Sequence, residues 1–270
     1  MKITFIGGGN MANALIGGLC KQGFPAADIS VVEPLAENRE RLSASFGVAC
    51  LPAAGASILG SDVLLLSVKP QQMREALAPL AGKLERQLVI SIAAGMRLAD
   101  ISCWLGGYAK LVRAMPNTPA LIGAGITGLY ASPSIDGAAR RQAEMILGAV
   151  GKTLWITEEP LMDAVTAVSA SGSAYVFYFI EALRDSGRAL GFSEEQAGLL
   201  ALETVAGAAA LAAGSTEDVA LLRQRVTSKG GTTEAALNSL NADGFKAIIL
   251  RAVKAADTRG RELGDLLGKG

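Results

Sequence analysis

The sequence predicts an α/β fold in which a doubly wound, mostly parallel sheet precedes an all-helical second domain. Three observations predict it. Short apolar runs alternate with helical periodicity over the first part of the 270-residue chain. One further strand–helix–strand pattern follows between Ile126 and Trp155, and no strand pattern appears after Glu158. Such alternation is typical of parallel strands with helices on both faces. We therefore expect domains at residues 1–157 and 158–270.

The strands are predicted from short apolar runs, and the helices from apolar residues that recur every three to four positions. Met11, Leu15 and Leu19 follow the first strand at helical spacing. The predicted strands are Ile3–Ile6, Ile29–Val32, Val48–Leu51, Val63–Val68, Gln87–Ile92, Lys110–Ala114, Ile126–Tyr130 and Lys152–Ile156. Further helices are predicted over Leu35–Phe46, from Pro70, over Ile135–Val150, and in the second domain over Ser173–Leu190, Ser193–Ala213, Thr232–Leu240 and Gly244–Leu267.

The composition excludes several kinds of chemistry. The chain has no histidine, which rules out Ser-His-Asp triads, HExxH zinc proteases and histidine-dependent hydroxy-acid dehydrogenases. The three cysteines, Cys20, Cys50 and Cys103, form no CxxC motif. We therefore expect no metal site, and scattered free thiols are typical of a reducing cytosol.

The charge and hydropathy indicate a cytoplasmic protein without nucleic-acid or membrane partners. Lys and Arg total 25 against 25 Asp and Glu, so the chain has no net charge to attract nucleic acid or an anionic membrane. The N-terminus resembles a strand and not a signal peptide. Apolar stretches such as Val205–Ala213 are shorter than the ~20 residues that span a bilayer.

A glycine-rich turn directly follows the first predicted strand. Gly7, Gly9 and Ala12 form a GxGxxA pattern before an amphipathic helix. The first glycine allows a tight turn, the second lets a pyrophosphate approach the backbone, and the small third residue lets the helix pack closely. The free N–H groups at the helix start attract phosphate. This context predicts a Rossmann-type dinucleotide-binding domain.

The residues after the second strand leave the choice between NADH and NADPH open. Glu33 ends that strand, where an acidic residue usually accepts a hydrogen bond from the 2′-hydroxyl of NAD. Arg39 and Arg41 follow and could instead bind a 2′-phosphate. A solvated charged face of the next helix is the simpler interpretation of these arginines.

Three further loops follow strands at the same predicted sheet edge, Ser67–Gln71, Ser91–Gly95 and Arg113–Pro119. Ligands of open parallel sheets bind at this edge, so we expect one pocket there, with Asn117 held in a proline-flanked loop. In the second domain, Ser169–Ala174 and Thr227–Glu234 carry small hydroxyl residues at predicted helix starts. Such starts bind carboxylates, although simple N-capping by Ser or Thr is the alternative.

Six segments occur in the order IGGGNMA, SVKPQ, SIAAG, RAMPNTPA, DAVTAVSASGSAYVFYFIEAL and VTSKGGTTEAAL. Through these segments the chain resembles pyrroline-5-carboxylate reductases over residues 2–267. The resemblance implies reduction of the cyclic imine 1-pyrroline-5-carboxylate to L-proline, the last step of proline biosynthesis, with NADPH or NADH. Cofactor contacts are expected at Ile6, Gly7, Gly8, Gly9, Asn10, Met11, Glu33, Val68, Lys69, Pro70, Gln71, Ala93, Ala94, Gly95 and Asn117. Substrate contacts are implied at Ser228, Gly231, Thr232 and Thr233, and the Thr233 hydroxyl is expected to hydrogen-bond the ring nitrogen.

The segments depart from the family pattern at Ala54, Ala170, Ser173 and Lys229. These departures bear on cofactor affinity and local helix geometry and leave the reaction type unchanged. A 3-hydroxyacid dehydrogenase is the enzymatic alternative, but Ser173–Arg188 lacks the lysine those enzymes use. A non-catalytic dinucleotide sensor is the alternative from another class.

The start of the second domain predicts association. Ala174–Ile180 is apolar nearly all round, and a helix of that kind must be buried in a large core or against another subunit. We expect a homo-oligomer, and the resemblance implies dimers interlocked through the helical domain.

Overall fold

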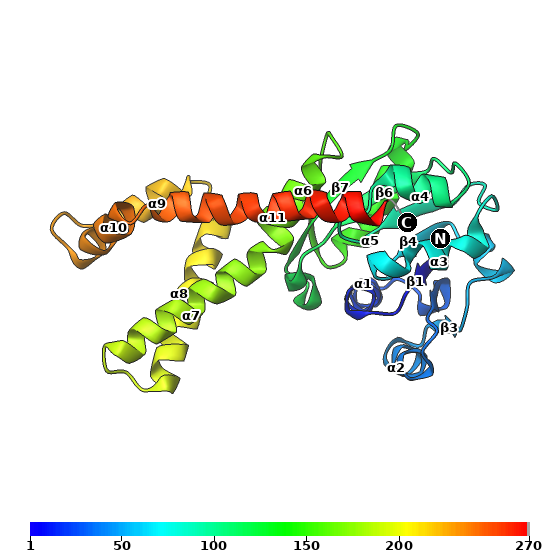
Figure 1. Ribbon diagram of the computed structural model, residues 1–270. Helices are drawn as coiled ribbons and strands as arrows, with labels where there is room; N and C mark the ends of the chain where they lie inside the picture. The colour runs from blue at the N-terminus through cyan, green and yellow to red at the C-terminus, as the bar shows by residue number, and fades with distance from the viewer. Residues whose placement is uncertain (269–270) are drawn as a thin grey trace. The chain divides into compact units, whose positions relative to one another are not determined.

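The computed structural model describes residues 1–268 and divides the chain into two compact units (Figure 1). The first unit comprises Met1–Ser171 and the C-terminal segment that begins at Ala256, and the second comprises Gly172–Ala255. The first unit carries the sheet and the second is helical. This arrangement confirms the predicted fold class.

The sheet of the first unit has the strand order β3-β2-β1-β4-β5-β6-β7-β8. Its strands are β1 (Ile3–Ile6), β2 (Ile29–Val32), β3 (Ala49–Leu51), β4 (Val63–Leu66), β5 (Leu88–Ser91), β6 (Leu111–Met115), β7 (Gly125–Ala131) and β8 (Gly151–Trp155). All neighbours pair in parallel except β6 and β7. The connection from β6 to β7 is too short for a parallel crossover, which needs about a dozen residues or more.

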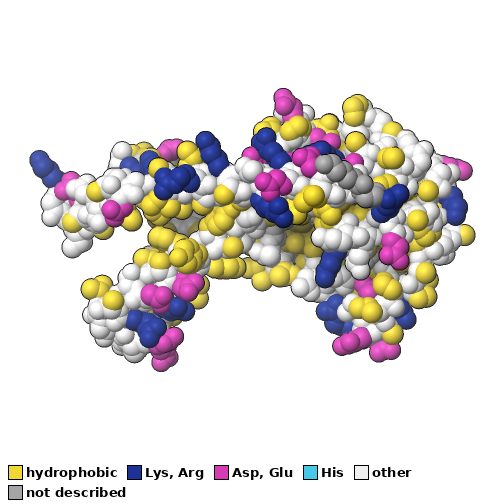
Figure 2. Space-filling view, viewed as in Figure 1, with side chains coloured by type: hydrophobic (Ala, Val, Ile, Leu, Met, Phe, Trp, Pro, Cys, Tyr) yellow, Lys and Arg dark blue, Asp and Glu magenta, His cyan; other side chains and the backbone are white. Residues whose placement is uncertain are grey.

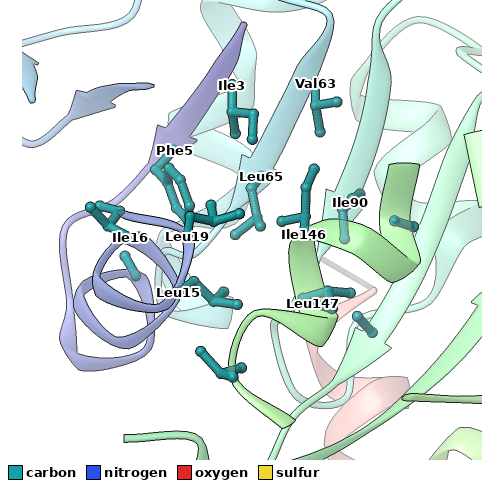
Figure 3. Packing of buried hydrophobic residues seen from close by; sticks show 14 of the residues in the cluster. Ile3, Phe5, Leu15, Ile16, Leu19, Val63, Leu65, Ile90, Ile146 and Leu147 are labelled. Atoms are coloured by element: carbon teal, nitrogen blue, oxygen red, sulfur yellow. The ribbon is translucent and has the colours of Figure 1, made fainter. Parts of the chain in front are cut away.

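Helices cover both faces of this sheet. They are α1 (Asn10–Lys21), α2 (Ala36–Phe46), α3 (Met73–Leu77), α4 (Leu98–Trp104), α5 (Gly137–Gly148) and α6 (Leu161–Val165). Residues of the central strands alternate between two hydrophobic clusters, as expected from the period of two in a strand. On one face, Phe5 and Leu65 pack with Leu15 of α1 and Leu147 of α5 (Figure 3). On the other face, Leu64 joins residues of α3 and α4.

The sequence-based domain boundary and the division by contacts do not coincide. The sequence predicts a boundary at residue 157, whereas the first unit continues through α6 to Ser171. The reason is that α6 packs on the sheet. The Val165 side chain lies against Gly128 of β7, which leaves no room for a Cβ atom there, and Asp163 pairs with Arg113 of β6 at 2.7 Å.

The second unit is helical throughout. It contains α7 (Gly172–Ala189), α8 (Glu194–Gly214), α9 (Val219–Arg225) and α10 (Thr232–Ala242), and α11 (Phe245–Leu267) begins in it and ends in the first unit. The capping box predicted at Ser193 is present, because its hydroxyl accepts the Gln196 N–H at 3.2 Å and the Gln196 side chain accepts the Ser193 N–H at 3.0 Å. The seven-residue helices α4 and α9 were not predicted, because so short a segment shows little periodicity.

The segment Ser169–Ala174 differs from its prediction as a helix start. It lies inside a helical stretch in which a π-helical turn (Thr166–Ala170) joins α6 to α7. The Ser171 N–H donates to Thr166 O at 2.9 Å. Because backbone donors in this turn are already paired, the segment lacks the free N–H groups of a helix N-terminus.

The helices of the second unit leave much apolar surface uncovered. Phe177, Tyr178, Leu199 and Leu211 are exposed, and Figure 2 shows yellow side chains gathered over these helices. Helix α8 is long and apolar enough to cross a membrane. Only 11% of its most apolar segment is buried. The sequence had predicted only apolar stretches shorter than a membrane span. Length and composition alone do not separate a membrane span from a helix covered by a partner subunit.

Candidate functional site

The glycine loop between β1 and α1 is shaped for close approach of an anion. Gly7 has a φ of 103°, and a Cβ atom there would lie 2.7 Å from Ser67 O, so only glycine fits. Gly9 is the N-cap of α1, and no side chain caps this helix. A Cβ atom on Gly9 would meet no protein atom within 4 Å. The N–H groups that start α1 therefore face an open cradle, and the loop fits the pyrophosphate of a dinucleotide.

Glu33 has a structural function that the sequence did not indicate. Its side chain is 7% exposed at the end of β2. One carboxylate oxygen accepts the Gly8 N–H at 2.9 Å, and the other accepts the Leu35 N–H at 3.0 Å. Glu33 therefore fastens the glycine loop to the turn after β2. Each oxygen keeps a lone pair, so acceptance from a ribose hydroxyl is compatible with this function.

Of the two arginines after β2, Arg39 binds the backbone, whereas Arg41 is exposed, as expected of a solvated face. Arg39 Nη1 donates to Glu33 O at 2.9 Å and to Pro34 O at 2.7 Å. Arg41 Nη2 makes a longer contact of 3.4 Å with Gly8 O. Because Arg39 has further donors free for a phosphate, both cofactors remain compatible with this end of β2.

The predicted loops meet at one sheet edge because β1, β4, β5 and β6 are consecutive neighbours. The strand before the second loop ends at Leu66 and not at Val68, because the Ser67 hydroxyl turns to donate to Gly7 O at 2.8 Å. Ser67 thus ties this loop to the glycine loop, which the sequence analysis missed. In the same loop Val68 and Pro70 are half-buried, whereas Lys69 and Gln71 are exposed.

The two remaining loops of this edge differ in what their backbone atoms do. After β5, Ala93 is buried, Ala94 is exposed and Gly95 has a φ of 75°. After β6, the Asn117 side chain accepts the Ile126 N–H at 2.9 Å. Asn117 therefore holds its own loop to β7 through its side-chain oxygen, and its amide N–H₂ is the part left for a cofactor.

The start of α10 assembles the predicted substrate residues in the second unit. Gly230 has a φ of 74°, and its N–H donates to the Glu234 carboxylate at 2.7 Å. Gly231 is the N-cap, and no side chain caps α10. Ser228 and Thr232 are exposed and Thr233 is half-buried. The N–H groups of the first turn are consequently free to bind a carboxylate, with the Thr233 hydroxyl one position inside the helix.

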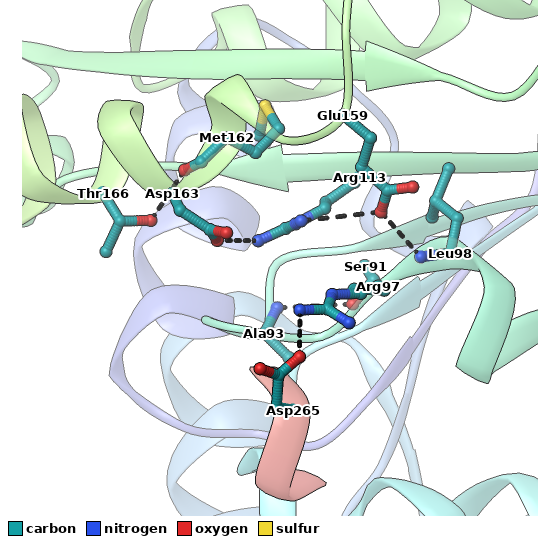
Figure 4. A network of polar contacts seen from close by, with 10 residues as sticks. All are labelled: Ser91, Ala93, Arg97, Leu98, Arg113, Glu159, Met162, Asp163, Thr166 and Asp265. Atoms are coloured by element: carbon teal, nitrogen blue, oxygen red, sulfur yellow. Dashed lines mark hydrogen bonds and ion pairs between the residues drawn. The ribbon is translucent and has the colours of Figure 1, made fainter. Parts of the chain in front are cut away.

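A buried network of charged side chains adjoins the loop after β5 (Figure 4). Arg113 is 4% exposed and pairs with Asp163 at 2.7 Å and with Glu159 at 3.5 Å. Glu159 also accepts the Leu98 N–H at 2.7 Å. The sequence signal for this network is Arg113, a single charged residue inside an apolar strand. From the sequence alone, Arg113 is only the first residue of the predicted loop Arg113–Pro119.

Comparison with known proteins gives the family. The model "Pyrroline-5-carboxylate reductase dimerisation" matches residues 159–263, and "NADP oxidoreductase coenzyme F420-dependent" matches residues 2–95. A pyrroline-5-carboxylate reductase of Pseudomonas aeruginosa is 46% identical over 269 residues, covering 99% of this chain and 98% of that protein. The chain belongs to the pyrroline-5-carboxylate reductase family. This confirms the resemblance seen in the six segments.

Solved structures of the family agree with the fold. The pyrroline-5-carboxylate reductase of Coxiella burnetii has a TM-score of 0.92 at 38% identity and covers 97% of this chain and 98% of its own. The Plasmodium falciparum enzyme, solved with NADP bound, has a TM-score of 0.85 at 28% identity, with 98% of each chain covered. The dimerisation model, which spans α7, α8, α9 and α10, indicates that members of this reductase family form oligomers.

Proposed function

We propose that this reductase transfers a hydride from NADPH or NADH to 1-pyrroline-5-carboxylate and releases L-proline. The observation that carries the proposal is the start of α10, where an uncapped helix N-terminus adjoins the half-buried Thr233. Free N–H groups suit the carboxylate, and a hydroxyl suits the ring nitrogen. The family relationship over nearly the full chain supports the same substrate.

The cofactor is assigned to the edge formed by the loops after β1, β4, β5 and β6. The open face of Gly9 and the uncapped start of α1 support binding of the pyrophosphate there. The bound nicotinamide would supply the hydride. Ala93, Ala94 and Gly95 would orient its ring, and Glu33 would hold the glycine loop in place.

The chemistry needs little from the protein beyond binding and orientation. A cyclic imine that arrives protonated already carries the positive charge that attracts a hydride, so no strong acid is required. The protonated nitrogen donates to the Thr233 oxygen, while the Ser228 hydroxyl and the N–H groups of Thr232 and Thr233 hold the carboxylate. The Gly231 N–H donates to Ser228 O at 3.0 Å and closes the turn that presents them. Orientation of two reactants alone is worth about 7–11 kcal/mol in favourable intramolecular cases. A chain without histidine is compatible with this reaction.

We assign the apolar groove of the second unit to contacts with a second copy. A cavity of about 590 Å³ is lined by residues of α7, α8 and α11, including Tyr178, Phe179 and Ile248. The match to a dimerisation model supports association through the helical domain. The homo-oligomer we propose is cytoplasmic and is built from dimers interlocked through that domain. Coverage of α8 by the partner would also account for its low burial in one chain.

The test is turnover by the purified full chain. Oxidation of NADPH or NADH should depend on added 1-pyrroline-5-carboxylate, and chromatography should identify L-proline as the product. No oxidation with either cofactor, while both bind, would instead support a dinucleotide sensor. Oxidation of a 3-hydroxyacid by NAD(P)⁺ would support the dehydrogenase alternative, although the basic residues of α7 are Arg184 and Arg188.

A further inference from the structure

The last turns of α11 lie directly against the loop after β5. Gly264 is the buried residue of this helix, and a Cβ atom there would lie 3.0 Å from Gly95 O. In return, a Cβ atom on Gly95 would meet Gly264 N at 3.5 Å and Leu267 Cδ1 at 3.6 Å. Helix backbone and loop backbone are therefore in contact, and an alanine at position 264 would push the Gly95 carbonyl away by a few tenths of an ångström.

A charged contact adjoins this packing. Asp265 Oδ1 accepts a hydrogen bond from Arg97 Nη2 at 2.5 Å (Figure 4). Both side chains are largely in solvent, at 43% and 58% exposure. An ion pair with this exposure adds only about 0–1 kcal/mol to stability, so its main effect is on the orientation of the segment that carries Arg97.

The loop is also held by the core, because the side chains of Ala93 and Met96 are buried. The Ala93 N–H donates to Ser91 Oγ at 3.3 Å, and the Leu98 N–H donates to Glu159 at 2.7 Å. Between these two anchors Ala94 is exposed and Gly95 adopts a positive φ. The α11 contacts fall on Gly95, between the buried side chains of Ala93 and Met96.

We propose that Gly264 and Asp265 are positioning residues for hydride transfer, because they fix the loop on which the nicotinamide ring lies. This inference rests on the proposed assignment of Ala93–Gly95 to the cofactor. A displacement of about 1 Å in a reacting group can lower a rate on the order of a hundredfold. Small changes at the end of α11 should therefore slow the chemical step more than they weaken binding.

The experiment compares three variants of the full chain. Gly264→Ala introduces the Cβ atom that the Gly95 carbonyl opposes, and Asp265→Asn removes the charge that holds Arg97. Glu262→Gln is the matched control, because Glu262 pairs with Arg259 at 2.8 Å on the same helix with similar exposure. Each is measured for kcat, the KM of the imine, the melting temperature and the kinetic isotope effect with cofactor deuterated at the transferred position.

We expect Gly264→Ala to lower kcat on the order of tenfold and Asp265→Asn to lower it about two- to fivefold, as befits an exposed ion pair. Both should raise the isotope effect. The KM of the imine and the melting temperature of Asp265→Asn should stay near the wild-type values, and Glu262→Gln should match wild type throughout. A wild-type kcat in both test variants would overturn the proposal. So would a loss of kcat that appears equally in Glu262→Gln.

A fourth variant separates this proposal from the assignment beneath it. Ala94→Leu places a larger side chain on the exposed middle of the loop, so the Kd of NADPH or NADH, measured by fluorescence, should rise. If that Kd is unchanged while the wild-type chain reduces the imine, the loop does not contact the cofactor and the proposal falls while the reaction stands. If the wild-type chain fails to reduce the imine, the proposed function falls first.

Discussion

The exchange of Thr233 for Val tests the substrate site most directly, because it keeps volume and β-branching and removes one hydroxyl. Thr233 is the second residue of α10, whose N-cap is Gly231 and which no side chain caps. The sequence alone left open that Thr233 caps this helix, and loss of such a cap costs about 1 kcal/mol. With the cap excluded, we expect the free energy of unfolding of Thr233→Val to stay near that of wild type.

The kinetic effect should be much larger. Thr233 is half-buried, so a protonated ring nitrogen that loses the hydroxyl has little water to replace it. Removal of one partner from a hydrogen bond to a charged group costs about 1.5–3 kcal/mol, or roughly ten- to more than a hundredfold in kcat/KM. The cofactor Kd should change little, because the glycine loop belongs to the other compact unit.

The assay combines steady-state kinetics with varied imine, cofactor titration and thermal unfolding on one sample. Thr258→Val is the control, because Thr258 is exposed on α11 and its loss should affect none of the three. A Thr233→Val enzyme with wild-type kcat/KM would place the nitrogen contact elsewhere. A lowered melting temperature with normal kinetics would mean that the hydroxyl supports the helix after all.

Three further outcomes follow from the first unit. Glu33→Gln should raise kcat/KM for NADPH relative to NADH. The amide oxygen can still accept the Gly8 N–H, and the neutral side chain does not repel a 2′-phosphate. An unchanged ratio would mean that Glu33 only holds the glycine loop and does not contact the ribose. Asp163→Ala should lower the free energy of unfolding by about 3 kcal/mol in urea, because the buried Arg113 loses its closer partner and keeps only the 3.5 Å contact with Glu159. A loss under about 1 kcal/mol would contradict this. A thiol reagent should modify the exposed Cys103 before Cys20, as followed by peptide mass spectrometry. Burial raises the pKa of the Cys20 thiol and so lowers its thiolate fraction. Faster reaction of Cys20 would contradict this prediction.

The sequence predicted the features that have local signals. Most strands contain an apolar run, and the glycine-rich pattern after the first strand marks the tight turn at Gly7. The meeting of the loops at one sheet edge followed from parallel pairing. These features are marked by short stretches of sequence, which is why composition and spacing are enough to predict them.

The features that the sequence missed join residues distant in the chain. Glu33 meets Gly8 only because β1 and β2 pair, and Arg97 meets Asp265 only because α11 returns to the first unit. The prediction of a helix start at Ser169–Ala174 was wrong for another reason. Ser and Gly are common at helix starts, but a π-helical turn keeps this helix continuous, and no local pattern distinguishes the two cases.

The pH dependence of kcat/KM tests whether the imine binds already protonated. If the imine binds already protonated and Thr233 only accepts its hydrogen bond, then no side chain has to titrate for the hydride to transfer. Lys229 and Glu234 are the ionisable residues beside the start of α10, and the Glu234 carboxylate is engaged with the Gly230 N–H. The pH profile of kcat/KM should therefore follow the ionisation of the free imine and fall as the pH rises above its pKa. Glu234→Gln should keep the inflection at the same pH, whereas an inflection that moved in this variant would identify an acid that the proposed mechanism lacks.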